Sequence, residues 1–135
     1  DEPREKLFYK HKNLKLMGFK QHEVVLNNFK KSSITVVCSR WQEPFGRTSL
    51  EASSRGCAVI ISNRGGLPET VTNAIILKKL NQNTLYKELS NLIENNKKRL
   101  KLQKSSLVNF YLTNKFVCRQ IDSYRSLIIQ KKKRV

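Results

Sequence analysis

The chain is poor in cysteine, and its three cysteines lie far apart, at Cys38, Cys57 and Cys118. They form no Cys-x-x-Cys pair and no histidine stands at ligand spacing from them, so the sequence predicts neither a zinc site nor a disulfide framework. Cys38 ends an apolar run and Cys57 precedes another. We interpret both as small buried side chains in a protein of a reducing compartment.

Long apolar runs are missing too. No stretch approaches the ~18–20 apolar residues that a membrane span requires, and the charged N-terminus has no apolar leader, so we expect a cytoplasmic protein. The 135 residues contain no repeat or linker, which predicts one domain at most. Because aromatic residues make up only 8% of the chain, we expect Leu, Ile and Val to build the core.

Acidic residues are scarce, since 10 Asp and Glu stand against 27 Lys and Arg and the net charge is +17. Residues 72–135 carry +12 of this excess and end in the basic tail Lys131-Lys132-Lys133-Arg134. Such a field attracts nucleic acid, anionic lipid or a phosphorylated substrate, while a compositional bias of the chain is an equally good explanation. No Asp-x-Asp pair is present, so we expect no metal site.

Strand-like and helix-like segments alternate along the chain. Apolar runs predict strands at 34–38, 58–61 and 75–77, with a shorter one at 14–17 that is closed by Gly18. Helical periodicity predicts helices at 22–30 and 48–55, a short helix with Pro68 in its first turn, and three helices from Asn83 onward, the last with an apolar face between Phe116 and Ile128. This alternation predicts an α/β fold with a parallel sheet.

The most informative stretch is Glu43-Pro44-Phe45-Gly46-Arg47-Thr48-Ser49-Leu50-Glu51, which Gly65-Gly66-Leu67-Pro68-Glu69 follows. A glycine turn lets the backbone approach a ligand, and the free amides of a helix start favour an anion such as a diphosphate. Two carboxylates can accept hydrogen bonds from hydroxyl groups of the same ligand. Because both stretches follow strands, we expect them to meet at the carboxyl edge of the sheet, where ligands bind.

From about Leu14 to Tyr124 the sequence resembles the donor-binding half of GT-B glycosyltransferases, in particular the retaining family 4 (glycosyl transferases group 1). The spacing from Glu43 to Glu51 fits the E-P-F-G-x-x-x-x-E element of that family, and Gly65 to Glu69 fits its G-G-x-x-E element. The resemblance implies a Rossmann-like sheet with helices on both faces. It also implies transfer of a sugar from a nucleoside-diphosphate sugar to a glycan or lipid-linked acceptor, without a metal or other cofactor.

The resemblance further implies a role for each candidate residue. Glu51 is expected to hold the ribose hydroxyls, and Glu43, the catalytic candidate, is expected to face the transferred sugar and the reacting centre. The other expected donor contacts are Phe45 and Gly46 at the sugar, Arg47 and Thr48 at the diphosphate, the second glycine turn Gly65 and Gly66, the nucleobase segment Gly18, Phe19 and Lys20, and Ser39 beside the nucleotide.

Several of these residues also have a purely structural interpretation. Glu51 fits a capping box with Thr48 as the N-cap, and both roles can coexist because a carboxylate has two oxygens. Glu43 can be a solvated loop acid paired with Arg40 or Arg47. The remaining alternatives are a solvent-directed Arg47, a plain strand-to-helix turn at Gly65 and Gly66, and solvated or capping roles for the isolated His11 and His22.

Residues 1–135 match only part of the family's donor domain. The family's acceptor domain and its Gly-Arg…Lys-Gly element, which neutralises the diphosphate, are not matched, and Lys6, Lys10 and Lys12 are no convincing replacement. We therefore expect an N-terminal acceptor domain as partner, and weak donor binding with little turnover by this chain alone. The basic second half favours a peripheral position at the inner face of an anionic membrane. The alternatives are a non-catalytic partner module and a nucleic-acid-binding protein, the latter disfavoured because no recognition signature is present.

Overall fold

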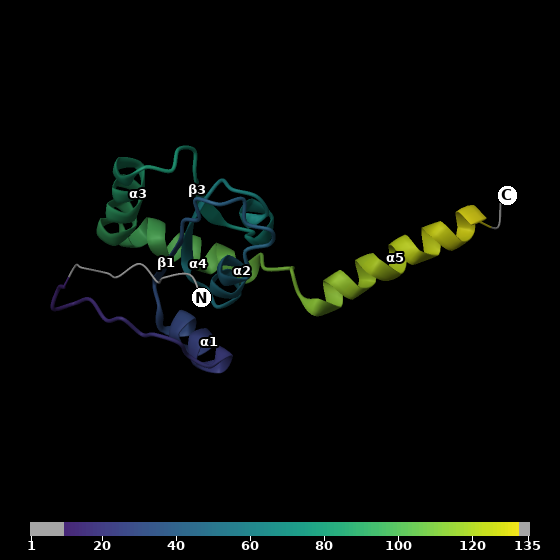
Figure 1. Ribbon diagram of the computed structural model, residues 1–135, viewed down its shortest axis with the longest axis horizontal. Coiled ribbons are helices and arrows are strands. Elements are labelled where there is room, and N and C mark those ends of the chain that lie inside the picture. Colours follow the sequence, from purple (N-terminus) through teal and green to yellow (C-terminus); the bar gives the residue numbers. More distant parts are fainter. Residues whose placement is uncertain (1–9, 133–135) are drawn as a thin grey trace.

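The computed structural model describes residues 10–132, and its core is a parallel three-stranded sheet in the order β1-β2-β3 (Figure 1). The strands pair in register, with Val36 opposite Ile60 and Ile60 opposite Ile75. The elements are α1 (His22–Lys31), β1 (Ile34–Val37), α2 (Arg47–Ser54), β2 (Ala58–Ser62), the 3-10 helix η1 (Leu67–Thr70), β3 (Ala74–Leu77), α3 (Gln82–Glu94), α4 (Asn96–Val108) and α5 (Asn114–Lys132). The predicted α/β fold is confirmed.

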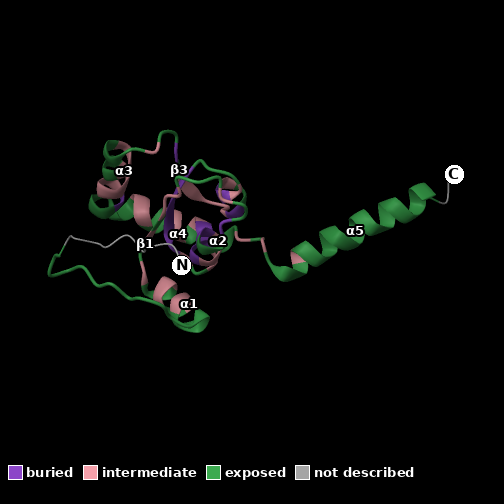
Figure 2. Ribbon diagram, in the orientation of Figure 1, coloured by how far each residue is buried: buried purple, intermediate pink, exposed green. Residues whose placement is uncertain are grey.

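The central strand β2 is buried along its whole length and supplies both halves of the core (Figure 2). Its alternate residues point to opposite faces, as the period of a strand requires. Val59 and Ile61 pack with side chains of α1, α2 and η1, whereas Ala58 and Ile60 pack with side chains of α3 and α4. Helices therefore cover both faces of the sheet, and aliphatic residues dominate the core as predicted.

Glycine and asparagine fix the helix ends that position the loops. Gly56 follows α2 with a φ of 77°, a left-handed conformation that suits glycine, and so ends the helix as predicted. The Asn81 side chain accepts a 2.8 Å hydrogen bond from the Thr84 amide at the start of α3. Asn95 caps α4 in the same way through the Lys98 amide, at 2.9 Å. Each cap satisfies an amide that the helix itself leaves free.

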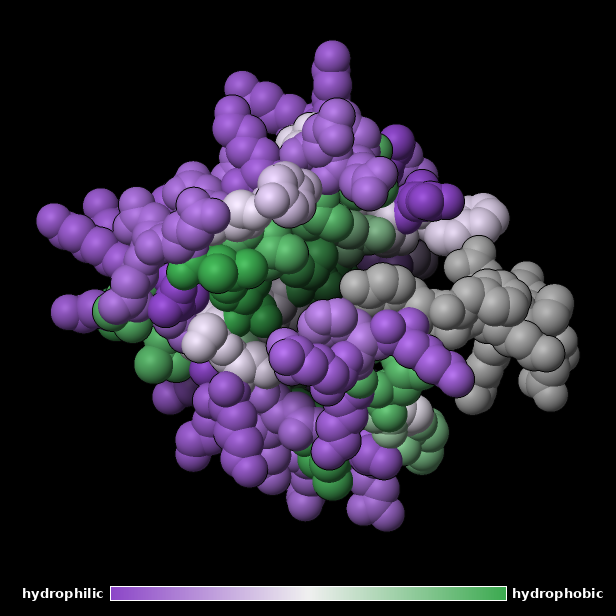
Figure 3. All heavy atoms as spheres, turned by 90° about the vertical axis from the view of Figure 1, so that its left-hand side faces the viewer, coloured by the Kyte–Doolittle hydropathy of each residue, from purple (hydrophilic) through white to green (hydrophobic). Residues whose placement is uncertain are grey.

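The strand predicted at 14–17 does not form. Its side chains are exposed, with Leu16 at 70%, and in the described part of the chain the sheet ends at β1 on one side and at β3 on the other. A strand needs a neighbour to satisfy its backbone groups, and this segment pairs with neither edge. Seen from the left-hand side of Figure 1, the surface shows an apolar area framed by hydrophilic side chains (Figure 3). On the edge strand β1, Val36 is 40% exposed.

The last predicted helix forms, but every described residue from Arg119 onward is exposed, so most of its apolar face covers nothing in the described part of the chain. α5 leaves the body of the domain and extends alone (Figure 1). Ile121, Tyr124 and Ile128 are 53%, 62% and 59% exposed. Within residues 10–132, no helix combines the length and hydropathy that crossing a membrane requires.

Candidate functional site

The loop between β1 and α2 turns into the helix at Gly46. This glycine has a φ of 83°, is buried, and is the N-cap of α2. The amides of Ser49 and Leu50 donate to its carbonyl at 3.1 and 3.3 Å. Within residues 10–132, the amides of Arg47 and Thr48 have no hydrogen-bond partner, as expected for the first residues of a helix. The start of α2 therefore presents two free backbone donors and the positive end of the helix dipole.

The second glycine turn lies directly against this loop. The Gly66 amide donates to the Glu43 carbonyl at 2.7 Å, and the Gly65 amide donates to the Gln42 side-chain carbonyl, also at 2.7 Å. A Cβ on Gly65 would overlap the Glu43 backbone, and one on Gly66 would lie 2.7 Å from the Pro44 carbonyl oxygen. The two motifs meet at the carboxyl edge of the sheet, as the sequence predicted. Gly65 and Gly66 are thus more than a plain turn, because the close approach of the two loops requires them.

Glu51 is held by two basic side chains through one of its oxygens. Arg47 Nε donates to Glu51 Oε1 at 2.6 Å, and His22 Nε2 lies 2.8 Å from the same oxygen. The Glu51 side chain is only 16% exposed, while those of Arg47 and His22 are 70% and 51% exposed. Within residues 10–132, Oε2 takes part in no hydrogen bond. One face of the carboxylate is therefore fixed and the other is available to a ligand.

This arrangement corrects two structural interpretations. The capping box is wrong, because α2 begins at Arg47 and Gly46, not Thr48, is the N-cap, with no side-chain cap. The Arg47 side chain is 70% exposed, as the solvent-directed interpretation expects, and its guanidinium is also bonded to Glu51. A purely solvated or capping His22 is also wrong, because its ring contacts Glu51 and the N-cap of α1 is Gln21.

Glu43 and Phe45 lie in the loop between β1 and α2. The Glu43 backbone is tied to Gly66, and its side chain is half-buried. Within residues 10–132 its carboxylate forms no ion pair with Arg40 or Arg47, so the paired loop acid is not observed. Phe45 is 57% exposed. Thr48 is exposed on the first turn of α2.

The remaining candidate residues have fewer contacts with the two glycine loops. Gly18, Phe19 and Lys20 are exposed, and no hydrogen bond within residues 10–132 links them to the two glycine loops. They precede α1, whose first residue reaches Glu51. Ser39 closes its own turn, because the Trp41 amide donates to its Oγ at 3.1 Å. Its carbonyl accepts a 2.8 Å bond from Ser62 at the end of β2, which joins the two strand ends.

His22 is the site residue that sequence reasoning missed. It stands 29 residues before Glu51, and no motif connects the two positions. Only the packing of α1 beside α2 brings them together. In the described part of the chain, no group of three or more His, Cys, Asp or Glu side chains is arranged to hold a metal ion.

Comparison with known proteins identifies the family of this chain. A family model described as Glycosyl transferases group 1 matches residues 4–107, which is most of the chain. The protein therefore belongs to the group 1 glycosyltransferases. Spore coat protein SA of Bacillus subtilis (strain 168) is 37% identical over 79 residues, which are 56% of this chain and 21% of that protein. The chain thus spans about a fifth of this relative's length.

Proposed function

We propose that this chain is the donor-binding part of a retaining glycosyltransferase of the GT-B fold and of family 4. The proposed reaction breaks the bond between the anomeric carbon of a sugar and the diphosphate of its nucleoside carrier. It then joins that carbon to a hydroxyl oxygen of a glycan or lipid-linked acceptor, whose proton leaves. Membership in the group 1 glycosyltransferases supports glycosyl transfer, and the site geometry supports the assignment of roles.

The observation that supports the proposal most is that only one oxygen of the Glu51 carboxylate is hydrogen-bonded within residues 10–132. Arg47 and His22 fix Oε1, so Oε2 can accept hydrogen bonds from two ribose hydroxyls without losing its orientation. The free amides of Arg47 and Thr48 lie one turn earlier in the same helix, where they can meet the diphosphate. A nucleoside diphosphate presents both kinds of group at once.

Glu43 is the proposed catalytic residue. Its position on the rim, with the backbone locked to Gly66, suits a carboxylate that faces the transferred sugar. As the bond to the diphosphate lengthens, positive charge grows on the anomeric carbon, and a fixed negative charge lowers the energy of that state. Phe45 and Gly46 would bind sugar hydroxyls through their backbone groups, and Gly18, Phe19, Lys20 and Ser39 would line the nucleobase side.

The acceptor is proposed to be bound elsewhere, by an N-terminal acceptor domain, so this chain alone should turn over poorly. No metal ion or other cofactor is proposed, and nucleic acid is not the proposed partner.

Contact with an anionic membrane is proposed through the basic second half. Lys131 and Lys132 are exposed at the end of α5, whereas Lys133 and Arg134 lie outside the described residues. Vesicle binding that survives neutralisation of residues 131–134 would count against this contact.

The donor site is tested by calorimetric titration of the folded chain with UDP, GDP and ADP. We expect saturable binding of one nucleotide, and a loss of at least about tenfold in affinity for Glu51→Ala, because two hydroxyl contacts disappear. Glu94→Ala is the matched control, since Glu94 is an exposed acid at the end of α3. Absence of nucleotide binding, or equal binding by Glu51→Ala, would favour the non-catalytic partner module instead.

A further inference from the structure

Every strand of the sheet is followed by a cationic residue at its carboxyl end. Arg40 comes three residues after β1, Arg64 two residues after β2, and Lys78 and Lys79 directly after β3. Neighbouring parallel strands lie about 4.8 Å apart. At the carboxyl ends of these strands, Val37 pairs with Ile61 and Ser62 pairs with Leu77. The four cations therefore come from three adjacent strand ends at one edge of the sheet.

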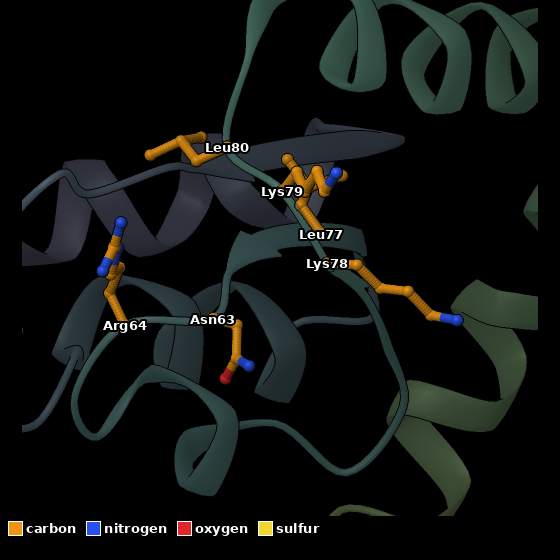
Figure 4. Close-up of a pocket in the computed structure, with 6 residues that line it drawn as sticks. All are labelled: Asn63, Arg64, Leu77, Lys78, Lys79 and Leu80. Carbon is orange, nitrogen blue, oxygen red and sulfur yellow. The ribbon is translucent and has the colours of Figure 1, made fainter.

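Two cavities open between these strand ends. The first has a volume of about 360 Å³ and is lined by Asn63, Arg64, Leu77, Lys78, Lys79 and Leu80 (Figure 4). The second, of about 390 Å³, includes Cys38, Arg40, Asn81 and the same Leu80 in its lining. Because they share Leu80, the cavities are neighbours, and we call them together the edge trough. Figure 4 shows Arg64 rising from the loop after β2 on the side of Leu80, while Lys78 extends to the opposite side.

The edge trough has cations but no counter-charge. No Asp or Glu lines either cavity. Within residues 10–132, Arg40, Arg64, Lys78 and Lys79 form no ion pair, whereas Arg47, Lys98 and Arg125 each have a carboxylate partner. All four side chains are exposed and so are reachable by a ligand. The second cavity also meets the start of α3 at its N-cap Asn81, where the helix dipole adds positive potential.

We propose that the edge trough binds the phosphate groups of a phosphorylated substrate, with pyrophosphate as its simplest model. Four cations at one sheet edge, with no carboxylate in the lining, create a positive potential that attracts a multiply charged anion. Arginine pairs with phosphate in a bidentate geometry, so Arg40 and Arg64 are the anchoring residues and the two lysines supply further charge. The trough lies beside the Glu43 loop, because Arg40 and Arg64 flank the contact between Gln42 and Gly65.

The test is calorimetric titration of the whole chain with pyrophosphate. We expect Arg64→Gln and Arg40→Gln each to weaken binding about tenfold, because each removes a charge-assisted contact. Arg119→Gln on the exposed α5 makes the same change in net charge and should weaken binding less than about twofold. Absence of pyrophosphate binding, or equal weakening by Arg64→Gln and Arg119→Gln, would overturn the proposal.

Phosphate at this edge can come from two sources, the diphosphate of the donor or a phosphate of the acceptor. If the donor supplies it, the nucleoside diphosphate competes with pyrophosphate and Arg64→Gln weakens both. If the acceptor supplies it, the nucleotide and pyrophosphate bind together, and Arg64→Gln weakens pyrophosphate alone. We expect Glu51→Ala to bind pyrophosphate as the unaltered chain does, because the edge trough does not need that carboxylate. This result would show that the edge trough and the ribose contact of Glu51 are separate.

Discussion

Glu51 Oε1 lies 2.8 Å from Nε2 of His22, a residue of a different helix that stands 29 positions earlier in the chain. The same oxygen accepts from Arg47 Nε at 2.6 Å, and Arg47 Nη2 lies 3.4 Å from His22 Nε2. The three side chains form a closed group that ties the start of α1 to the start of α2. A shift of α1 would therefore change the position of the Glu51 carboxylate, which is proposed to hold the ribose.

Replacing His22 by alanine should weaken nucleotide binding more than it weakens the fold. The pair is partly exposed, so we expect the free energy of unfolding to fall by less than about 1 kcal/mol. Glu51 loses one of its two anchors, and we expect nucleotide affinity to fall roughly three- to tenfold, as measured by calorimetry. Asn27→Ala, an exposed change on the same helix, should change neither quantity. Unchanged affinity in His22→Ala would mean that Arg47 alone positions the carboxylate.

Gly65→Ala should be strongly destabilising because two costs combine. Gly65 has a φ of 52°, which costs a non-glycine residue about 1–2 kcal/mol, and a Cβ would also overlap the Glu43 backbone. We expect a total loss of roughly 3 kcal/mol or more in urea unfolding, or displacement of the Glu43 loop.

Gly18→Ala is the matched control for this substitution. Gly18 has a similar φ of 59°, but a Cβ there would meet nothing within 4 Å. Only the conformational cost of about 1–2 kcal/mol should remain. Equal losses for the two variants would show that contact between the glycine turn and the Glu43 loop contributes nothing to stability.

The sequence carried enough information to predict the sheet and the meeting of the two glycine motifs. Both follow from local patterns, since buried parallel strands have continuous apolar runs and their carboxyl ends share one edge. Local patterns could not predict what depends on distant partners. The contact of His22 with Glu51 needs the packing of α1 on α2. The run at 14–17 has strand propensity but pairs with neither edge of the described sheet. The capping box failed because the N-cap of α2 is Gly46, two residues before Thr48.

Thiol reactivity should single out Cys118. Burial raises the pKa of the Cys38 and Cys57 thiols, an effect that a hydrogen bond with Thr35 partly offsets at Cys57. Cys118 is exposed on α5. Since the thiolate is the reactive form, we expect one fast-reacting thiol near neutral pH and two that react at least roughly tenfold more slowly. Raising the pH should speed the reaction of both slow thiols, because it increases their thiolate fractions. Cys118→Ser should remove the fast phase, and a fast phase that persists would contradict the assignment.

Removing most of α5 should leave the domain's stability nearly unchanged. From Arg119 onward every described residue of the helix is exposed, whereas Val117 and Cys118 line a cavity of about 360 Å³ together with Phe45 and Leu50. A chain that ends after Cys118 keeps that contact and loses only exposed surface. We expect its free energy of unfolding to stay within about 0.5 kcal/mol of the full chain's, as for other surface changes, when both are unfolded in urea. A chain cut after Leu112 removes Val117 as well and should be less stable than the longer one. A marked loss already in the chain cut after Cys118 would show that the apolar face of α5 packs against the domain in solution.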